Sequence, residues 1–265
     1  MPENFNFDKA HATRIVEARQ ALLRELLPVC VRTLGLRTAL DAGCGVGYFS
    51  AFLRDSGLEV TALDGRPQNI EEARKRHAGI NFQVADVEDP AVQKLGPFDF
   101  VLCFGLIYHL ENPMRAFRNL RALTEKLLLV ESVATPERVP LLYLRDEPEI
   151  EDQGMLSLGA YPSEGALWKM AYRAGFPHVA RLANLPDHED FRSSFGHRRF
   201  RSMLAASMTA LGDPHFIPVA EPQNPPDPWV TDPTGLTKMA RRFRKFQQKP
   251  WKEQLAALWR RYGLR

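Results

Sequence analysis

The chain has 265 residues, 45% of them hydrophobic and 25% charged, and this composition is typical of a globular protein with an ordinary core. It contains no apolar run near the roughly 20 residues of a membrane-spanning helix and no N-terminal signal pattern, so we expect a cytoplasmic protein without a membrane span. Cys30, Cys44 and Cys103 are odd in number and scattered, which argues against a disulfide framework or a cysteine-based zinc site.

Apolar residues three or four positions apart predict a helix from about residue 11, with a bend or restart at Pro28 and an end at Gly35. Five short apolar segments then predict strands, with helices between most of them. These segments are 37–43, 58–64, 80–86, 98–105 and 126–133. Strands that alternate with helices predict a parallel, doubly wound sheet.

In the second half of the chain the regular alternation of strands and helices is interrupted. Residues 133–160 contain an acidic stretch, and a helix is predicted over 162–176. Two strands, at about 179–182 and 200–206, have no helix between them and predict an antiparallel hairpin. A Pro-rich segment then leads to a terminal helix whose apolar side carries Trp251, Leu255, Leu258, Trp259 and Tyr262.

A glycine-rich turn follows the first strand, where Gly43, Gly45 and Gly47 are spaced by two. A dinucleotide fingerprint would need its third glycine at the position of Tyr48, and a P-loop would need a Gly-Lys-Ser/Thr sequence that is absent here. The turn therefore indicates that a ligand approaches the backbone closely, but its glycine spacing matches the fingerprint of nicotinamide dinucleotide-binding proteins poorly.

Three acids stand at the ends of successive predicted strands or just before the glycines. Asp64 lies 17 residues after Gly47, where a carboxylate can accept hydrogen bonds from a ribose diol. Asp86 could receive an adenine amino group, and Asp41 could hold a cationic amino group. Ligands of open α/β sheets bind at the carboxyl ends of the strands, so these acids mark one site.

The segments "LDAGCGVG", "VTALD", "VAD" and "FDFVLCFGLIYHLENP" occur in that order, and together they resemble the class I S-adenosylmethionine-dependent methyltransferases over residues 37–207. The resemblance implies a Rossmann-like doubly wound sheet of seven strands, mostly parallel with an antiparallel last strand. It also implies S-adenosylmethionine as the cofactor. The residues expected to bind it are Asp41, Gly43, Cys44, Gly45, Gly47, Asp64, Gly65, Arg66, Asp86, Val87, Phe104 and Tyr108. The alternative is a Rossmann-like protein that binds another nucleotide or none.

Tyr108 and His109 follow the fourth strand, where the resemblance places the donor methyl group. We expect His109 to act as a general base or a substrate hydrogen-bond partner, because a histidine titrates near neutral pH. Tyr108 is expected to shape the donor pocket. The alternative is that both rings pack against Phe104. Glu131, at the end of the fifth strand, is expected to orient the substrate or merely to cap the strand.

The Tyr-His pair is also similar to the tRNA wobble-uridine carboxymethyltransferases, which use carboxy-S-adenosylmethionine. The resemblance implies that Tyr108 and Arg201 would grip the extra carboxylate, whereas Lys9 matches the family's lysine only weakly and the long N-terminal extension of that family is missing. Ordinary S-adenosylmethionine is therefore the expected donor, and Arg201 is kept as a candidate substrate residue.

Charge is distributed unevenly along the chain. Between Gly235 and Arg265 there are ten lysines and arginines against one glutamate, a net charge of +9 within a total of +3, so the rest of the chain is acidic. This tail could bind RNA phosphates, or it could be the solvated side of a helix. The acidic run at 146–152 is expected to be a solvated substrate lid, and no metal site is expected.

We therefore divide the chain into an N-terminal helical lid (1–36), an S-adenosylmethionine-binding domain (37–210) and a Pro-rich linker with a basic C-terminal helix (211–265). The expected activity is methyl transfer to an oxygen or nitrogen atom of a small molecule, such as a sugar or a secondary metabolite. The alternatives are a tRNA-modifying methyl- or carboxymethyltransferase with an RNA-binding tail, and a non-catalytic protein that only binds the donor.

Overall fold

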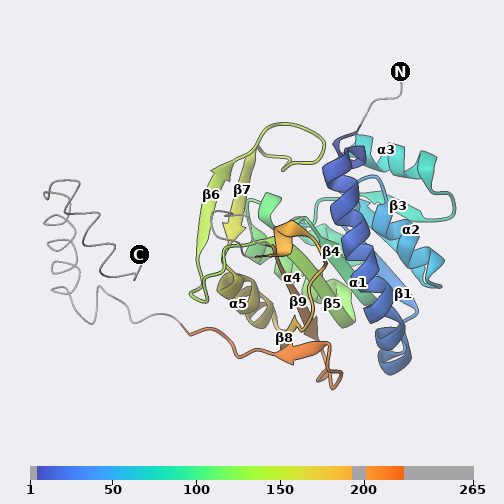
Figure 1. The fold of residues 1–265 in the computed structure, drawn as a ribbon. Helices are drawn as coiled ribbons and strands as arrows, with labels where there is room; N and C mark the ends of the chain where they lie inside the picture. The colour runs from blue at the N-terminus through green and yellow to red at the C-terminus, as the bar shows by residue number, and fades with distance from the viewer. Residues whose placement is uncertain (1–4, 193–200, 224–265) are drawn as a thin grey trace, which may run out of the picture. The chain divides into compact units, whose positions relative to one another are not determined.

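The computed structural model describes residues 5–192 and 201–223, and these residues form a mixed α/β structure around one large sheet (Figure 1). The helices are α1 (Ala10–Leu34), α2 (Tyr48–Asp55), α3 (Pro67–Arg76), α4 (Pro113–Leu123) and α5 (Glu164–Ala174). The short 3-10 helices are η1 (Asn6–Asp8), η2 (Pro90–Leu95), η3 (Ile107–His109) and η4 (Glu189–Phe191). The predicted terminal helix and basic tail lie outside the described residues.

The sheet has eight strands in the described residues, in the order β10-β8-β9-β5-β4-β1-β2-β3. Its strands are β1 (Thr38–Ala42), β2 (Glu59–Asp64), β3 (Asn81–Val84), β4 (Phe98–Phe104), β5 (Thr124–Val133), β8 (His178–Leu182), β9 (Arg201–Ser207) and β10 (Phe216–Pro218). Strands β3, β2, β1, β4 and β5 pair in parallel, and β9 pairs antiparallel with β5 and with β8. The predicted doubly wound, mostly parallel sheet with an antiparallel member is therefore confirmed.

Strand β10 is an addition to the predicted sheet. It comes from the segment that we expected to be a linker, and it pairs antiparallel with β8, so that β10 forms the edge of the sheet. Residue Pro218 ends β10 at this edge, where a missing N–H donor leaves no gap inside the sheet. The part of the expected linker at 216–218 thus belongs to the sheet.

Helices cover both faces of the sheet. One face packs against α1 and α2, with Leu23 and Leu53 fully buried, and the other packs against α4 and α5, with Phe117 and Leu167 fully buried. In Figure 1, α1 lies across the face turned to the viewer. This arrangement leaves the carboxyl ends of the parallel strands free to line a site.

Helix α1 differs from the sequence prediction at Pro28. It continues through this proline as one 25-residue helix and ends at Gly35, whose φ of 63° is left-handed, as predicted. A proline inside a helix removes one backbone hydrogen bond. Leu26, Leu27 and Cys30 are buried around it, and we attribute the continuity of the helix to this packing.

A second, two-stranded sheet was missed by the sequence analysis. Strands β6 (Leu142–Asp146) and β7 (Leu158–Pro162) pair antiparallel and are joined by residues 147–157. These connecting residues, which we call the lid loop, coincide with most of the acidic run that we expected to be a substrate lid. The hairpin rises beside the main sheet in Figure 1.

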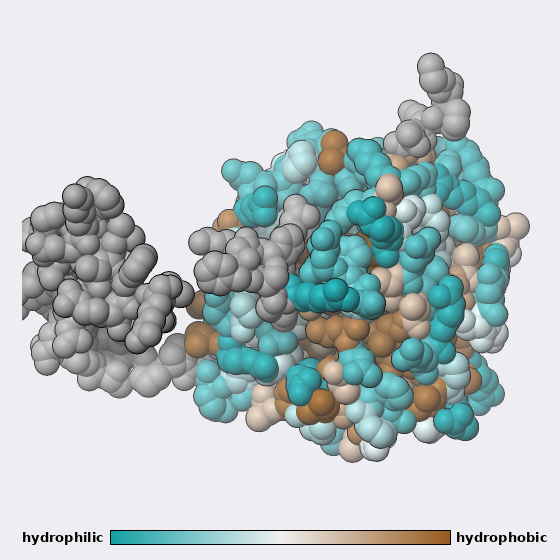
Figure 2. All heavy atoms as spheres, in the orientation of Figure 1, coloured by the Kyte–Doolittle hydropathy of each residue, from teal (hydrophilic) through white to brown (hydrophobic). Residues whose placement is uncertain are grey.

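Within the part of the chain that the structure describes, no helix combines the length and the apolar character needed to cross a bilayer. The face of the molecule shown in Figure 2 is largely hydrophilic, with apolar residues gathered in a patch below its centre. The two layers between the sheet and its helices hold most of the buried apolar residues.

Candidate active site

The glycine-rich turn joins β1 to α2 at the carboxyl edge of the sheet. Gly43, Gly45 and Gly47 have φ values of 78°, 52° and 89°, a region that side chains disfavour. A Cβ atom on Gly43 would also lie 2.9 Å from the Leu106 side chain. Glycine is therefore required here both by backbone conformation and by space.

Asp64, at the end of β2, is tied to this turn. Its carboxylate accepts hydrogen bonds from the backbone N–H groups of Gly45 (3.0 Å) and Arg66 (2.9 Å) and from the Asn69 amide (3.1 Å). Burial raises the pKa of Asp64, although these hydrogen bonds oppose the shift. The network fixes the orientation of the carboxylate at the wall of a cavity.

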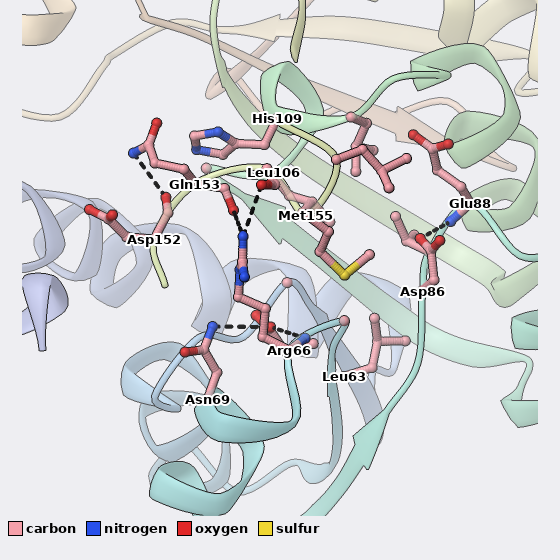
Figure 3. Close-up of a pocket in the computed structure, with 18 of the residues that line it drawn as sticks. Leu63, Arg66, Asn69, Asp86, Glu88, Leu106, His109, Asp152, Gln153 and Met155 are labelled. Atoms are coloured by element: carbon pink, nitrogen blue, oxygen red, sulfur yellow. Dashed lines mark hydrogen bonds between the residues drawn. The ribbon is translucent and has the colours of Figure 1, made fainter. Parts of the chain in front are cut away.

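The cavity lies between the ends of β1, β2, β3 and β4 and the lid loop, and it has a volume of about 100 Å³. Figure 3 shows Asp86 and Glu88 on one wall and His109 at the rim. The Met155 side chain enters from the lid loop and rests on Gly65, where a Cβ atom would collide with its sulfur. The lid loop thus fills part of the space above the strand ends.

Hydrogen bonds hold the lid loop in this position. The Arg66 guanidinium donates to the carbonyl groups of Gly154 (2.9 Å) and Gln153 (3.3 Å), as drawn in Figure 3. Asn69 donates to the Glu151 carbonyl at 3.1 Å, and the Asn6 backbone N–H donates to the Glu151 carboxylate at 2.7 Å. Residues of the cavity wall and of the N-terminal segment therefore both form hydrogen bonds with the lid loop.

Some of the expected cofactor residues line the cavity and others do not. Those in the lining are Gly43, Asp64, Gly65, Arg66, Asp86 and Val87. Those outside the lining are Asp41, Cys44, Gly45, Gly47, Phe104 and Tyr108. Asp41 is buried behind the turn and accepts a hydrogen bond from the Ser50 hydroxyl at 2.6 Å. Among the expected substrate residues, His109 lines the cavity, whereas Glu131 and Arg201 do not.

His109 is paired with an acid from the lid loop. Its Nδ1 lies 2.7 Å from the Glu147 Oε2 atom, and this carboxylate also accepts from the Gly154 N–H and the Tyr161 hydroxyl. Burial alone would raise the pKa of Glu147, but the hydrogen bond and charge of His109 outweigh it and hold the pKa below its usual value. An ionised Glu147 only accepts, so Nδ1 donates to it, and in the neutral form of the ring Nε2 is the nitrogen that carries the free lone pair.

Glu131 forms the centre of a buried ionic network. One carboxylate oxygen accepts from Arg19 of α1 at 2.6 Å, and the other accepts from Arg201 of β9 at 2.9 Å. Arg201 also donates to Asp190 at 3.1 Å, and its guanidinium lies 5.6 Å from the centre of the Tyr108 ring. The network fixes Tyr108, which stands with its ring 4.0 Å from that of His109.

The sequence analysis missed several residues of this site. Glu147 was seen only as one member of an acidic run, and its contact with His109 spans 38 residues of chain. Arg19 gave no signal because it sits in a helix of ordinary pattern. The segment "PQNIEEARKR", which starts directly after Arg66, could have pointed to Asn69 as a side chain at the helix N-terminus.

Comparisons with known proteins identify the type of domain. Residues 40–126 match the family model of the methyltransferase domain. These residues form a methyltransferase domain. A ubiquinone biosynthesis O-methyltransferase of Xanthomonas campestris pv. campestris is 32% identical over 109 residues, which cover 37% of this chain and 46% of that protein. Another of the same name, from Xanthomonas oryzae pv. oryzae, is 34% identical over 83 residues, covering 30% and 35%. The match thus spans less than half of these relatives.

Solved structures share the fold of the methyltransferase domain. The N-terminal domain of EvdMO1 with SAH bound has a TM-score of 0.58 at 22% identity, covering 72% of this chain and 80% of that one. A magnesium protoporphyrin IX methyltransferase from Synechocystis PCC 6803 with bound SAH has a TM-score of 0.52 at 19% identity, covering 76% and 88%. The likeness extends well beyond the residues of the family model.

Proposed function

We propose that this protein transfers a methyl group from S-adenosylmethionine to a hydroxyl oxygen of a small molecule. The observation that carries the proposal is the pair of His109 and Glu147 at the rim of the cavity. A hydroxyl becomes a good nucleophile when a base removes its proton, whereas a neutral amine can attack before it loses one. Of the oxygen and nitrogen acceptors expected from the sequence, the pair favours oxygen.

The residues at the strand ends suit the donor. Asp64 and Asp86 lie on the cavity wall with a carboxylate each, which fits a ribose diol and an adenine amino group. The donor supplies an activated methyl group on a sulfonium. Pockets for such ligands usually measure about 300–1,000 Å³, so Met155 and Leu156 would have to withdraw to admit it. The two neighbours with bound SAH support the same donor class.

The geometry around Arg201 favours ordinary S-adenosylmethionine over its carboxylated form. Arg201 is already paired with Glu131 and Asp190, and neither Arg201 nor Tyr108 lines the cavity. Lys9 is exposed and also lies outside the lining. An extra carboxylate on the donor would therefore have to displace an existing ion pair, which is costly for buried groups.

The charges around the cavity favour a neutral or cationic acceptor. Six carboxylate side chains stand in the described lining, against one arginine and no lysine. They are Asp64, Asp86, Glu88, Glu111, Glu151 and Asp152. Such a field repels anions. Since the curated relatives are named for an O-methylation in ubiquinone biosynthesis, phenols and catechols are the first acceptors to test, followed by sugars.

The tRNA-modifying alternative depends on the basic tail at 235–265, which lies outside the described residues. An acidic cavity rim does not favour a polyanion. Bulk tRNA belongs in the same assay as an acceptor, and salt-sensitive methylation of it would replace the small-molecule proposal.

The first experiment incubates the full chain with S-adenosylmethionine and the acceptor panel and follows SAH and methylated product by mass spectrometry. With an acceptor that turns over, His109→Gln is expected to lower kcat about 10²- to 10⁴-fold, the usual contribution of a general base. Donor affinity, measured by calorimetry, should stay nearly unchanged. Tight donor binding without turnover of any acceptor would instead indicate a binding protein.

Glu147→Gln tests whether the lid acid positions His109. The variant loses the negative charge that holds the Nδ1 proton, so we expect kcat to drop at least about tenfold and the pH profile of kcat to shift. The matched control is Glu149→Gln, an exposed lid acid whose carboxylate accepts a hydrogen bond from the Ser157 hydroxyl. Full activity in both the His109 and the Glu147 variants would end the proposed base mechanism.

A further inference from the structure

Two parts of the chain that are distant in sequence bring metal-binding side chains together outside the cavity. His11 stands in the first turn of α1, and His188 and Glu189 stand at the start of η4. One potential ligand atom from each residue lies within 4.8 Å of the others. The two imidazole rings meet edge to face, with centroids 5.7 Å apart.

The distances are close to those of a zinc site. Zinc holds nitrogen and oxygen ligands at about 2.0–2.2 Å, so the ligand atoms of a tetrahedral site stand about 3.3 Å from one another. Closing the remaining gap of about 1.5 Å requires side-chain rotation only, because His11 and Glu189 are both exposed. His188 is buried and provides the fixed point of the cluster.

A further carboxylate lies beside the cluster. The Asp190 Oδ2 atom lies 3.9 Å from the His11 Nε2 atom and adds negative charge beside the cluster.

Metal binding by His188 would break one existing hydrogen bond. The Asp190 backbone N–H donates to the His188 Nδ1 atom at 3.2 Å. A metal ion either takes this lone pair or binds Nε2 after the ring changes tautomer, and in both cases one long hydrogen bond is exchanged for a metal bond. The net worth of such a hydrogen bond is about 1 kcal/mol, which is far below the worth of a zinc site.

We propose that His11, His188 and Glu189 bind a divalent transition-metal ion, with zinc as the first candidate. Two imidazoles and a carboxylate fill three of the four positions of a tetrahedral zinc ion and leave the fourth for water. Magnesium and calcium prefer oxygen ligands, so the two imidazoles disfavour them. None of the three residues lines the cavity, so the ion would be structural. It would fasten the start of α1 to η4, next to the Asp190–Arg201 ion pair.

The test uses tag-free, metal-free full-length protein in equilibrium dialysis with Zn²⁺. Wild type is expected to bind one ion and to gain thermal stability, and Mg²⁺ is expected to do neither. His11→Ala and Glu189→Gln should each weaken zinc binding at least about tenfold, since even outer-shell changes cost this much. Both residues are exposed, so these variants are expected to fold, as circular dichroism can check. His178→Ala, on the exposed side of β8, is the matched control.

Zinc binding that is equal in wild type, His11→Ala and Glu189→Gln would place the ion elsewhere and overturn the proposal, as would binding of Mg²⁺ as tight as that of Zn²⁺. The proposal is independent of the methyl-transfer reaction. Calorimetric donor affinity is expected to stay the same with and without Zn²⁺, so either proposal can fail alone.

Discussion

Among single residues, Asp41 has a carboxyl group with unusual acid–base behaviour. Burial raises its pKa to about 7, the Ser50 hydrogen bond opposes this shift, and the charge of Asp64 adds to it. In the unfolded chain the group has its ordinary pKa of 3.8. Between about pH 4 and pH 7 the folded protein therefore holds a proton that the unfolded chain has lost. Linkage requires the free energy of unfolding to decrease as pH rises through this window.

Asp41→Asn removes this titration and keeps an oxygen that can accept from the Ser50 hydroxyl. In urea denaturation without donor, we expect the free energy of unfolding of wild type to fall between about pH 5 and pH 7.5 and that of the variant to fall less. Asp55→Asn, an exposed acid at the end of α2, is the control. Equal slopes in wild type and Asp41→Asn would contradict the assigned pKa.

The residues at the strand ends could be predicted because the signal is local. Asp64 and Asp86 each follow a short apolar run, and the edge they share is a consequence of parallel strands. Glu147 could not be predicted in the same way. An acid within an acidic run is usually solvated, and only the folded lid loop brings this one to His109. For the same reason, the pairing of His11 with His188 has no sequence signature.

At the scale of elements, the strands and helices of the main sheet were predictable from periodicity, and the hairpin of β6 and β7 was not. Strand β6 is exposed along its whole length and ends in charged residues, whereas β7 contains a glycine and a proline. The lid loop between them is far longer than a hairpin turn. Tertiary contacts, such as the hydrogen bond from the Ala160 N–H to the Leu110 carbonyl, hold the hairpin instead.

Helix α5 depends on one capping residue. The buried Ser163 hydroxyl accepts from the N–H groups of Ala166 (3.1 Å) and Leu141 (2.9 Å) and donates to the Val139 carbonyl (2.7 Å). Ser163→Ala is expected to lower the free energy of unfolding by about 1–3 kcal/mol, because a cap is lost and buried polar groups are left without a partner. Urea denaturation measures the loss.

Ser56→Ala is the control for this prediction, because Ser56 is exposed and its hydroxyl donates only to the carbonyl one turn earlier in α2. An unchanged denaturation midpoint in Ser163→Ala would show that water or backbone rearrangement replaces the cap.

At the scale of the whole molecule, the lid loop joins the cavity wall, the His109–Glu147 pair and the N-terminal segment. Gly154 is its tightest point, since a Cβ atom there would lie 2.6 Å from the His109 carbonyl oxygen and 2.9 Å from the Glu147 carboxylate. Gly154→Ala is expected to displace the lid loop from the cavity wall. The amide hydrogens of the lid loop should then exchange at least about tenfold faster, while those of the main sheet stay protected from exchange.

Hydrogen exchange followed by mass spectrometry measures this effect, and Gly212→Ala is the matched control, because a Cβ atom there would have no neighbour within 4 Å. If the loop exchanges at the same rate in Gly154→Ala and wild type, the contact with His109 does not hold it closed.

The position of Met155 on the lid loop also limits the rate at which a ligand can enter the cavity. While the Met155 sulfur rests on Gly65, the space above the strand ends is smaller than a nucleoside-sized ligand. A ligand that can enter only after the loop swings away binds no faster than the loop moves. In stopped-flow experiments the observed association rate should therefore rise with ligand concentration and then level off at the rate of loop opening. Loop motions of this kind take microseconds to milliseconds.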